Sequence, residues 1–438
     1  MRTLRARAIA LQLLLLAGGA AIGQVDTSAV SNTMPTANFG FMLPSRLGTL
    51  SYSLTGSEMV STAYSGGSLY ESTVGSGNLA YLSNSERDPF SAVISGGYLF
   101  NTGSSGVGSS GFADVAASQV YRTRAWVFVV SDGFSYLPQS PTTGFSGVPG
   151  LGDIGIPPVQ TGVGPDQTIL TNSGQRISNG LSGSATWQLT GSTDLQGSGS
   201  WQILHFVGNS IPGLDTSDYM FSFGPDHRID ARTSVSANAY YSRQTYPNYQ
   251  NAHIETEGVN VGFSHAWTRT ISTTISAGPE TSHGRTIIDI PAQVSVAASA
   301  EMSYAGRRNG GSVSYVRAVN GGSGVIFGAI SDTASVAINH PLSRDWNFGV
   351  SGAYSHSVGL APIFGETPTT NTIYGGAQAS RKLSESLSVY VSYTAQHQSA
   401  SGFSPLLQLF GFSNAYTGFN NTGAVGITFA PAPLNRGR

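Results

Sequence analysis

The segment Trp346–Tyr354, WNFGVSGAY, decides the fold class because its residues alternate strictly between two kinds. Successive side chains of a β-strand point to opposite faces, so this segment would place its large apolar side chains on one face. The apolar set is Trp346, Phe348, Val350, Gly352 and Tyr354, and the opposite set is Asn347, Gly349, Ser351 and Ala353. The segment therefore predicts a two-faced strand with an aromatic residue at each end.

The same alternation recurs along the chain. In Leu387–Gln396, apolar residues occupy the odd positions to 393, and Ser388, Tyr390, Ser392, Thr394 and Gln396 occupy the even ones. Residues 259–267 and 294–304 repeat this pattern. A strand between lipid and a wet lumen must alternate in this way, and crossing an outer membrane takes ~9–11 tilted residues. These runs are long enough to cross.

The composition supports a β-rich membrane protein. Only 10% of the residues are charged, whereas an ordinary soluble domain has roughly 25%. The 56 glycines, 20 phenylalanines and 19 tyrosines favour turns and strands over helices. The sequence has no cysteine, which excludes disulfides, cysteine-ligated metals and cysteine nucleophiles.

The N-terminus is typical of an export signal. Three arginines precede the short apolar run Ala8–Ala17, and small residues follow it. We expect residues 1–23 to be a signal peptide cleaved between about Ala21 and Gln24, and residues 24–47 to be a short periplasmic segment. Loss of Arg2, Arg5 and Arg7 takes the formal charge from −2 to −5, so no basic balance points to nucleic acid.

The complete pattern predicts an all-β fold, a transmembrane antiparallel up-and-down β-barrel over residues 48–430 with a tail at 431–438. We expect about 18 strands, or 16 if the weakly alternating segments 75–82 and 113–121 are excluded. The expected strands are 48–60, 75–82, 89–100, 113–121, 125–136, 177–189, 194–206, 216–224, 229–243, 253–267, 270–279, 293–305, 310–319, 328–340, 345–357, 371–382, 387–398 and 418–430. Short connections alternate with longer ones, as in outer-membrane barrels, and an even strand number places both ends in the periplasm.

Two other architectures show alternating faces. A soluble β-sandwich would carry more charge on its exterior than this composition allows. A secreted β-solenoid would require a repeat of fixed period, and the sequence contains none. The membrane barrel is therefore the favoured interpretation.

The export signal, the strand pattern and the connections resemble porin-like outer-membrane barrel proteins over nearly the whole mature chain. Val127–Gly152 resembles a group of uncharacterised acidobacterial barrel proteins. The resemblance implies outer-membrane lipid and the barrel-assembly machinery as partners. Such barrels commonly end on an aromatic residue used in assembly, whereas here the tail APAPLNRGR follows Phe429. Recognition is then expected through Val425, Ile427 and Phe429.

Catalytic motifs do not appear in the sequence. It has neither a G-x-S-x-G nucleophile elbow nor an H-E-x-x-H zinc motif, and its G-x-G-x-x-G matches open no recognisable helix. His205, His265 and His356 are candidates, by position alone, for a barrel-wall phospholipase, but the interpretation as interfacial or loop histidines is favoured. We therefore expect no enzymatic activity, cofactor or metal site.

Strand parity identifies candidate pore-lining residues. The charged ones are Arg232 and Glu301, and the polar ones are Gln188, Asn238, Asn260, Tyr390 and Gln396. A lumen with so few charges predicts weak ion selectivity.

The longest connection, 137–175, contains six prolines and only two charged residues, Asp153 and Asp166. Loops of this length are usually functional or disordered. The resemblance to porins implies that this third outer loop folds inward as a constriction and adds a mild cation preference. The alternative is a surface flap without a role in permeation.

Two functions are compatible with the sequence. The first is an outer-membrane channel for passive diffusion of small hydrophilic solutes or ions. The second is a structural or adhesive surface barrel without an open pore. Conductance in planar bilayers distinguishes them.

The connection lengths generate a topological prediction. Epitope tags in 137–175 or 399–417 should be accessible to antibody on intact cells, because long connections face outward. Tags in 306–309 or 383–386 should become accessible only after the outer membrane is permeabilised. Reversed accessibility would contradict this orientation.

Overall fold

The computed structural model describes residues 48–62, 69–85, 87–101, 109–137, 175–207, 215–248, 252–285, 289–306, 309–322, 327–362, 366–402, 417–432 and 434–435. In these residues the chain forms eighteen long strands and one two-residue strand. No helix in the described part of the chain is long and apolar enough to cross a membrane.

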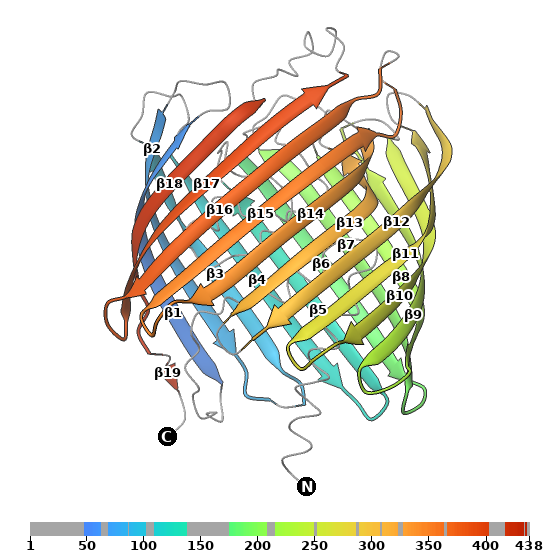
Figure 1. The fold of residues 1–438 in the computed structure, drawn as a ribbon, viewed down its shortest axis with the longest axis horizontal. Coiled ribbons are helices and arrows are strands. Elements are labelled where there is room, and N and C mark those ends of the chain that lie inside the picture. Colours follow the sequence, from blue (N-terminus) through green and yellow to red (C-terminus); the bar gives the residue numbers. More distant parts are fainter. Residues whose placement is uncertain are drawn as a thin grey trace.

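The strands follow one another as a meander (Figure 1). Their bounds are β1 Thr49–Thr62, β2 Leu69–Leu82, β3 Phe90–Asn101, β4 Ser110–Arg122, β5 Trp126–Leu137, β6 Gln175–Gln188, β7 Thr193–Val207, β8 Thr216–Arg228, β9 Thr233–Thr245, β10 His253–Ala266, β11 Ile271–Arg285, β12 Asp289–Ala305, β13 Gly310–Gly322, β14 Phe327–Pro341, β15 Trp346–Gly359, β16 Thr369–Lys382, β17 Leu387–Ser401, β18 Gly418–Phe429 and β19 Leu434–Asn435.

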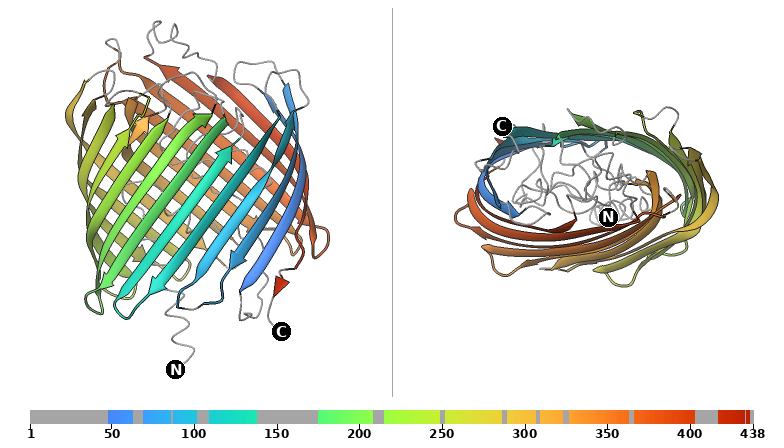
Figure 2. Two further views of the ribbon diagram at one scale, coloured as in Figure 1. Left: turned by 180° about the vertical axis from the view of Figure 1, so that it is seen from behind. Right: turned by 90° about the horizontal axis from the view of Figure 1, so that it is seen from above.

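Pairing between the first and last long strands closes the sheet. β1 and β18 are antiparallel from Leu54 opposite Phe429 to Ser61 opposite Thr422, and every other long strand pairs with its neighbours in sequence. Seen from above, the strands form a flattened ring (Figure 2). β1 begins and β18 ends at the same rim, where the short turns lie (Figure 1). The predicted fold class is confirmed, with eighteen long strands in the described part of the chain.

Two strand ends differ from the prediction for one physical reason. β8 continues through Pro225 to Arg228, and β11 continues through Pro279 to Arg285. Proline lacks a backbone N–H, so each was expected to end its strand. Each proline is paired with a residue of one neighbouring strand, β7 for Pro225 and β12 for Pro279. The pairing with the neighbour on the other side, β9 or β10, skips the proline.

Three further boundaries differ. β2 begins at Leu69 instead of residue 75, because the polar Glu71 and Thr73 occupy its lipid-facing parity and hide the alternation. It pairs with β1 over its whole length. β9 begins at Thr233 instead of residue 229. In the expected tail, Leu434 and Asn435 form β19 and pair with the beginning of β1.

The outer face of the barrel is apolar. Its large hydrophobic side chains are exposed, up to 76% for Val294 and 63% for Phe419. Aromatic residues concentrate near the two ends of the strands. Near the short turns they are Tyr52, Tyr121, Trp126, Phe128, Trp187, Trp267, Tyr304, Trp346, Phe348 and Phe429, and nearer the opposite rim they are Tyr98, Phe100, Phe134, Trp201, Tyr219, Tyr241, Tyr354 and Phe419. Two aromatic girdles around an apolar band are typical of transmembrane barrels.

The inner face is rich in hydroxyl groups that pair across neighbouring strands. Cross-strand hydroxyl pairs include Ser131 with Ser182, Ser198 with Ser222, Ser272 with Ser303, Ser276 with Ser299, Ser314 with Ser335, and Ser331 with Ser357, at 2.6–2.7 Å. All of these residues lie opposite to the lipid-facing parity. A hydroxyl can both donate and accept, so these pairs provide a neutral polar wall.

The short turns share a local design. In five of them a hydroxyl at the first turn position accepts a hydrogen bond, at 3.0–3.1 Å, from the backbone N–H three residues later. These hydroxyls belong to Thr123, Thr190, Thr268, Ser343 and Ser384. At the same position in another turn, Asp230 accepts from the Arg232 backbone N–H and the Thr233 hydroxyl, and these bonds hold the pKa of its carboxyl below the usual value. Such side chains stabilise tight turns by replacing backbone partners.

The two faces of β15 generate a stability prediction. Val350→Arg should lower the free energy of unfolding in lipid vesicles by about 2–4 kcal/mol, because Val350 lies on the lipid-facing side. Ser351→Arg, one residue away and facing inward, is the matched control and should cost much less. Equal costs in urea titrations of the two variants would contradict the assignment of faces.

Candidate functional site: the lumen wall

The register places several predicted pore-lining residues on the inner face. Asn238 of β9 lies directly opposite Asn260 of β10, which is only 2% exposed. Glu301 of β12 lies between Thr274 and Ser314 of the neighbouring strands. These three polar positions therefore share the wall formed by β9 to β13.

Tyr390 and Gln396 lie on the inner face of β17, and both are buried. The Tyr390 ring lies over Gly426, directly opposite on β18, where any side chain would overlap the ring. Gln188 has inward parity but occupies the short-turn end of β6 opposite Asp194, so it lies at the rim and is exposed.

The structure corrects the predicted position of one wall residue, and two others lie outside the described residues. Arg232 lies in the short turn before Thr233 and is exposed at the rim, because β9 starts later than its pattern indicated. Asp153 and Asp166 lie outside the described residues.

The set of charged wall residues is also corrected. Asp114 of β4, Asp218 of β8 and Glu280 of β11 all face inward and are buried. Strand parity could have found Asp218. The next residue, Tyr219, is exposed and faces the lipid, so Asp218 must face the lumen. Glu280 was missed because β11 was expected to end at the preceding proline.

Glu280 occupies a built position on the inner wall. It is 2% exposed, and its two carboxylate oxygens accept hydrogen bonds of 2.8 Å from the Tyr240 hydroxyl and from the Ser295 hydroxyl. The Tyr240 ring lies over Gly258, directly opposite on β10, where a Cβ atom would come within 2.7 Å of it. The glycine thus lets the ring reach along the wall to the carboxylate.

Asp114 is held in a comparable way. Its carboxylate accepts a short hydrogen bond from the Ser135 hydroxyl of β5, and both residues are buried. Together with Asp218, Glu280 and Glu301, it gives the described inner wall four carboxylates away from the short-turn rim.

Cations on the inner face have a different location. Arg122 and Arg228, which end β4 and β8, and Lys382, which ends β16, lie at the short-turn rim. Within the described strands, the inner wall away from the short-turn rim thus carries acidic groups, and the basic groups with inward parity and described side chains lie at that rim.

The inner wall also contains buried polar atoms that have no hydrogen-bond partner among the described residues. They belong to Ser95, Ser110, Ser178, Gln244, Asn260, Ser392 and Gln396, all with inward parity. Buried polar groups in folded proteins almost always have a partner, which can be water. These atoms therefore indicate that the inner face is hydrated.

The histidines considered for catalysis lie on the lipid-facing side. His205, His265 and His356 bond respectively to Asp215 at 2.7 Å, Thr233 at 3.0 Å and Asn371 at 2.8 Å. No group of three or more His, Cys, Asp or Glu residues in the described ranges could hold a metal ion. These contacts lie near the ends of the strands.

Comparison with known proteins finds no matching family model and no matching curated sequence. Solved structures with a similar barrel include Pseudomonas aeruginosa OccK2 (OpdF), at 11% identity over 87% of this chain and 98% of that one, with a TM-score of 0.44. Acinetobacter baumannii OccAB3 gives 10% identity over 88% and 99%, with a TM-score of 0.44. P. aeruginosa OprD gives 8% over 88% and 95%, with a TM-score of 0.43. At these values the similarity assigns no substrate.

The Tyr240–Glu280 hydrogen bond generates a prediction. Tyr240→Phe should lower the free energy of unfolding by about 1–3 kcal/mol, because it leaves a buried carboxylate oxygen without its donor. Tyr354→Phe is the control, since its hydroxyl bonds to Asn371 at the exposed face and should cost less. Equal decreases in the free energy of unfolding for the two variants, measured by denaturant titration, would show that the buried hydrogen bond stabilises the fold no more than the exposed one.

Proposed function

We propose that this protein is an outer-membrane channel for passive diffusion of small hydrophilic solutes or ions. The observation that supports the proposal best is the pairing of an apolar, aromatic-girdled exterior with a hydroxyl-rich inner face that retains unpartnered polar atoms. Barrels of ~16–18 strands enclose enough width for an aqueous channel. Water along such a wall provides the path for solutes.

The charge of the wall sets the preference among solutes. Asp114, Asp218, Glu280 and Glu301 attract cations, while the basic groups lie at the rim. We therefore expect cations and neutral polar solutes to pass more readily than anions. Glucuronate, the solute named in an OccK2 complex, is an anion and should be disfavoured here. We also propose that Asp153 and Asp166, in the connection 137–175, add to this cation preference.

The location and biogenesis are proposed on the same basis. The export signal would deliver the chain to the periplasm, and the apolar band would place it in outer-membrane lipid. Val425, Ile427 and Phe429 form an exposed apolar row on the outer face of β18, the last strand to close the barrel. This row is the expected contact for the barrel-assembly machinery despite the tail that follows.

Selectivity measurements test the function. In planar bilayers the protein should conduct KCl with a permeability ratio favouring potassium, and Glu301→Gln with Asp114→Asn should bring that ratio closer to unity. Glu58→Gln is the matched control, because this carboxylate faces the outer side and bonds to Thr73. An unchanged permeability ratio in the variant with both lumen substitutions would show that these carboxylates do not set the ion preference. Absence of conductance in a folded barrel would favour the structural or adhesive surface protein.

A further inference from the structure

Glu280 is a buried carboxylate with no cationic partner among the described residues. Its two oxygens accept hydrogen bonds from neutral hydroxyl groups. Arg243 and Arg317 line the same cavity as Glu280, but both form ion pairs elsewhere. Arg243 pairs with Glu255 at 3.4 Å, and Arg317 pairs with Asp332 at 2.9 Å. Buried charges in proteins are usually paired, so the position of Glu280 favours a positively charged occupant.

The cavity beside Glu280 has a volume of about 60 Å³. Three further polar side chains near the carboxylate line it, and they belong to Asn260 of β10, Ser276 of β11 and Ser299 of β12. Ser299 lies directly opposite Ser276, which precedes Gly278 and Glu280 on the inner face of β11. Asn260 lies beside Gly278, because a Cβ atom on this glycine would come within 2.8 Å of the Asn260 Oδ1. The register therefore gathers the four polar side chains around one stretch of β11.

Asn260 adds an observation that is independent of the carboxylate. The residue is 2% exposed, and its Oδ1 has no hydrogen-bond partner among the described residues. A buried oxygen in this state requires a donor, and each Glu280 oxygen also has a second lone pair that can accept. The cavity thus offers several acceptors to a group that carries a positive charge and N–H donors.

The hydroxyls of Ser276 and Ser299 supply a second kind of contact. They bond to each other at 2.7 Å, and each hydroxyl oxygen has two acceptor lone pairs. Ser276 and Glu280 lie about 13 Å apart along β11, a span that a hexose-sized solute with a hydrogen bond at each end can bridge. One solute can therefore place an ammonium group at the carboxylate and a hydroxyl group at the serines.

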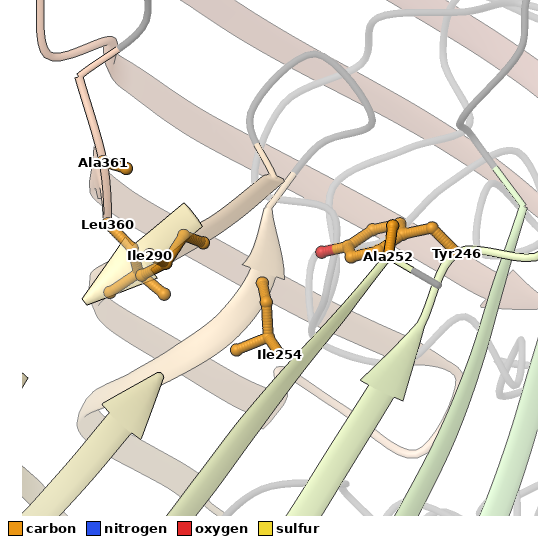
Figure 3. Close-up of a cluster of buried hydrophobic side chains, with 6 residues drawn as sticks. All are labelled: Tyr246, Ala252, Ile254, Ile290, Leu360 and Ala361. Carbon is orange, nitrogen blue, oxygen red and sulfur yellow. The ribbon is translucent and has the colours of Figure 1, made fainter. Parts of the chain in front are cut away.

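An apolar cluster holds the strands around the cavity together on the side of the outer rim. Ile254, which lines the cavity, packs in this cluster with Ile290 and with Leu360 from the end of β15 (Figure 3). These contacts connect β10, which carries Asn260, to β12, which carries Ser299. A site whose groups are held in place before binding loses less conformational entropy when a solute binds.

We propose that the cavity at Glu280 is a binding subsite for a protonated amino sugar. The ammonium group donates to the Glu280 carboxylate and to the Asn260 Oδ1, and ring hydroxyls donate to Ser276 and Ser299. A water-sized group takes about 10–15 Å³ of such a cavity, so roughly four to six of them fit, enough for the ammonium and the adjoining hydroxylated carbons. The rest of the ring stays in the lumen. This subsite rests on the proposed channel function and names the class of solute that the wall favours.

Ligand-observed NMR tests the site. The folded mature protein, in a polyoxyethylene detergent that carries neither charge nor sugar, is titrated at pH 6 with glucosamine, glucose or cyclohexylammonium. Glucose keeps the ring hydroxyls without the positive charge, and cyclohexylammonium keeps the charge without the hydroxyls. Saturation transfer should report an affinity for glucosamine several-fold above that for either analogue. Equal affinities for glucosamine and one of the analogues would overturn the proposal.

Variants locate the binding. Glu280→Gln removes the charge with little change of shape and should weaken glucosamine binding about tenfold, because hydrogen bonds to charged groups are the stronger ones. Asp114→Asn is the charge-matched control, since this buried carboxylate lies on the inner wall outside the cavity and its loss should weaken binding far less. Equal effects of these two substitutions would contradict a site at Glu280. Asn260→Ala leaves no charge unpaired, should weaken binding several-fold, and serves if Glu280→Gln does not fold.

Folding of each variant is checked by heat-modifiable migration in gels, and KCl conductance is measured on the same proteins. Binding does not depend on an open lumen, so the two proposals can fail separately. Selective glucosamine binding to a barrel that does not conduct would support the subsite and contradict the channel function. Conductance without selective glucosamine binding would overturn the subsite and leave the channel function intact.

Discussion

The need to satisfy every backbone hydrogen bond within the bilayer is the constraint on which this structure depends. A hydrocarbon layer offers no partner to a free N–H or C=O, so a strand can cross it only with neighbours on both sides. The pairing of β1 with β18, whose residues are separated by most of the chain, supplies the last of these neighbours. This pairing converts a meander of hairpins, each marginally stable alone, into a closed wall in which β1 and β18 are no longer edge strands.

Closure also sorts the side chains into two environments. With the ring complete, one parity of every strand faces lipid and the other faces the enclosed space. Val350 and Ser351 illustrate the division, since adjacent residues experience hydrocarbon and a hydrated wall. Two inward glycines also shape the wall. Gly258 leaves room for the ring of Tyr240, and Gly426 leaves room for the ring of Tyr390, so both rings lie along the wall.

The electrostatics of the proposed channel follow from this sorting. Cations near the ends of β4, β8 and β16 remain at the wet rim, whereas Asp114 and Glu280 are held within the wall by hydroxyl donors. A carboxylate inside a barrel influences a passing ion at short range and in reduced dielectric, so few of them are sufficient to set a preference. β12 departs from the regular wall, because its residues Asp289–Ala297 have no pairing with β13.

The amino-acid sequence by itself determined the two-faced strands and the closed barrel class, because local alternation such as that of Trp346–Tyr354 reports which environment each side chain requires. It did not reveal that β8 and β11 continue through Pro225 and Pro279, because the loss of an N–H is tolerated only where a neighbouring ladder omits that residue. The place of Glu280 on the wall depended on that continuation. The left-handed Gly328 packs against Ile254 and Leu360, which come from segments far apart in the chain, and only the tertiary structure brings these together.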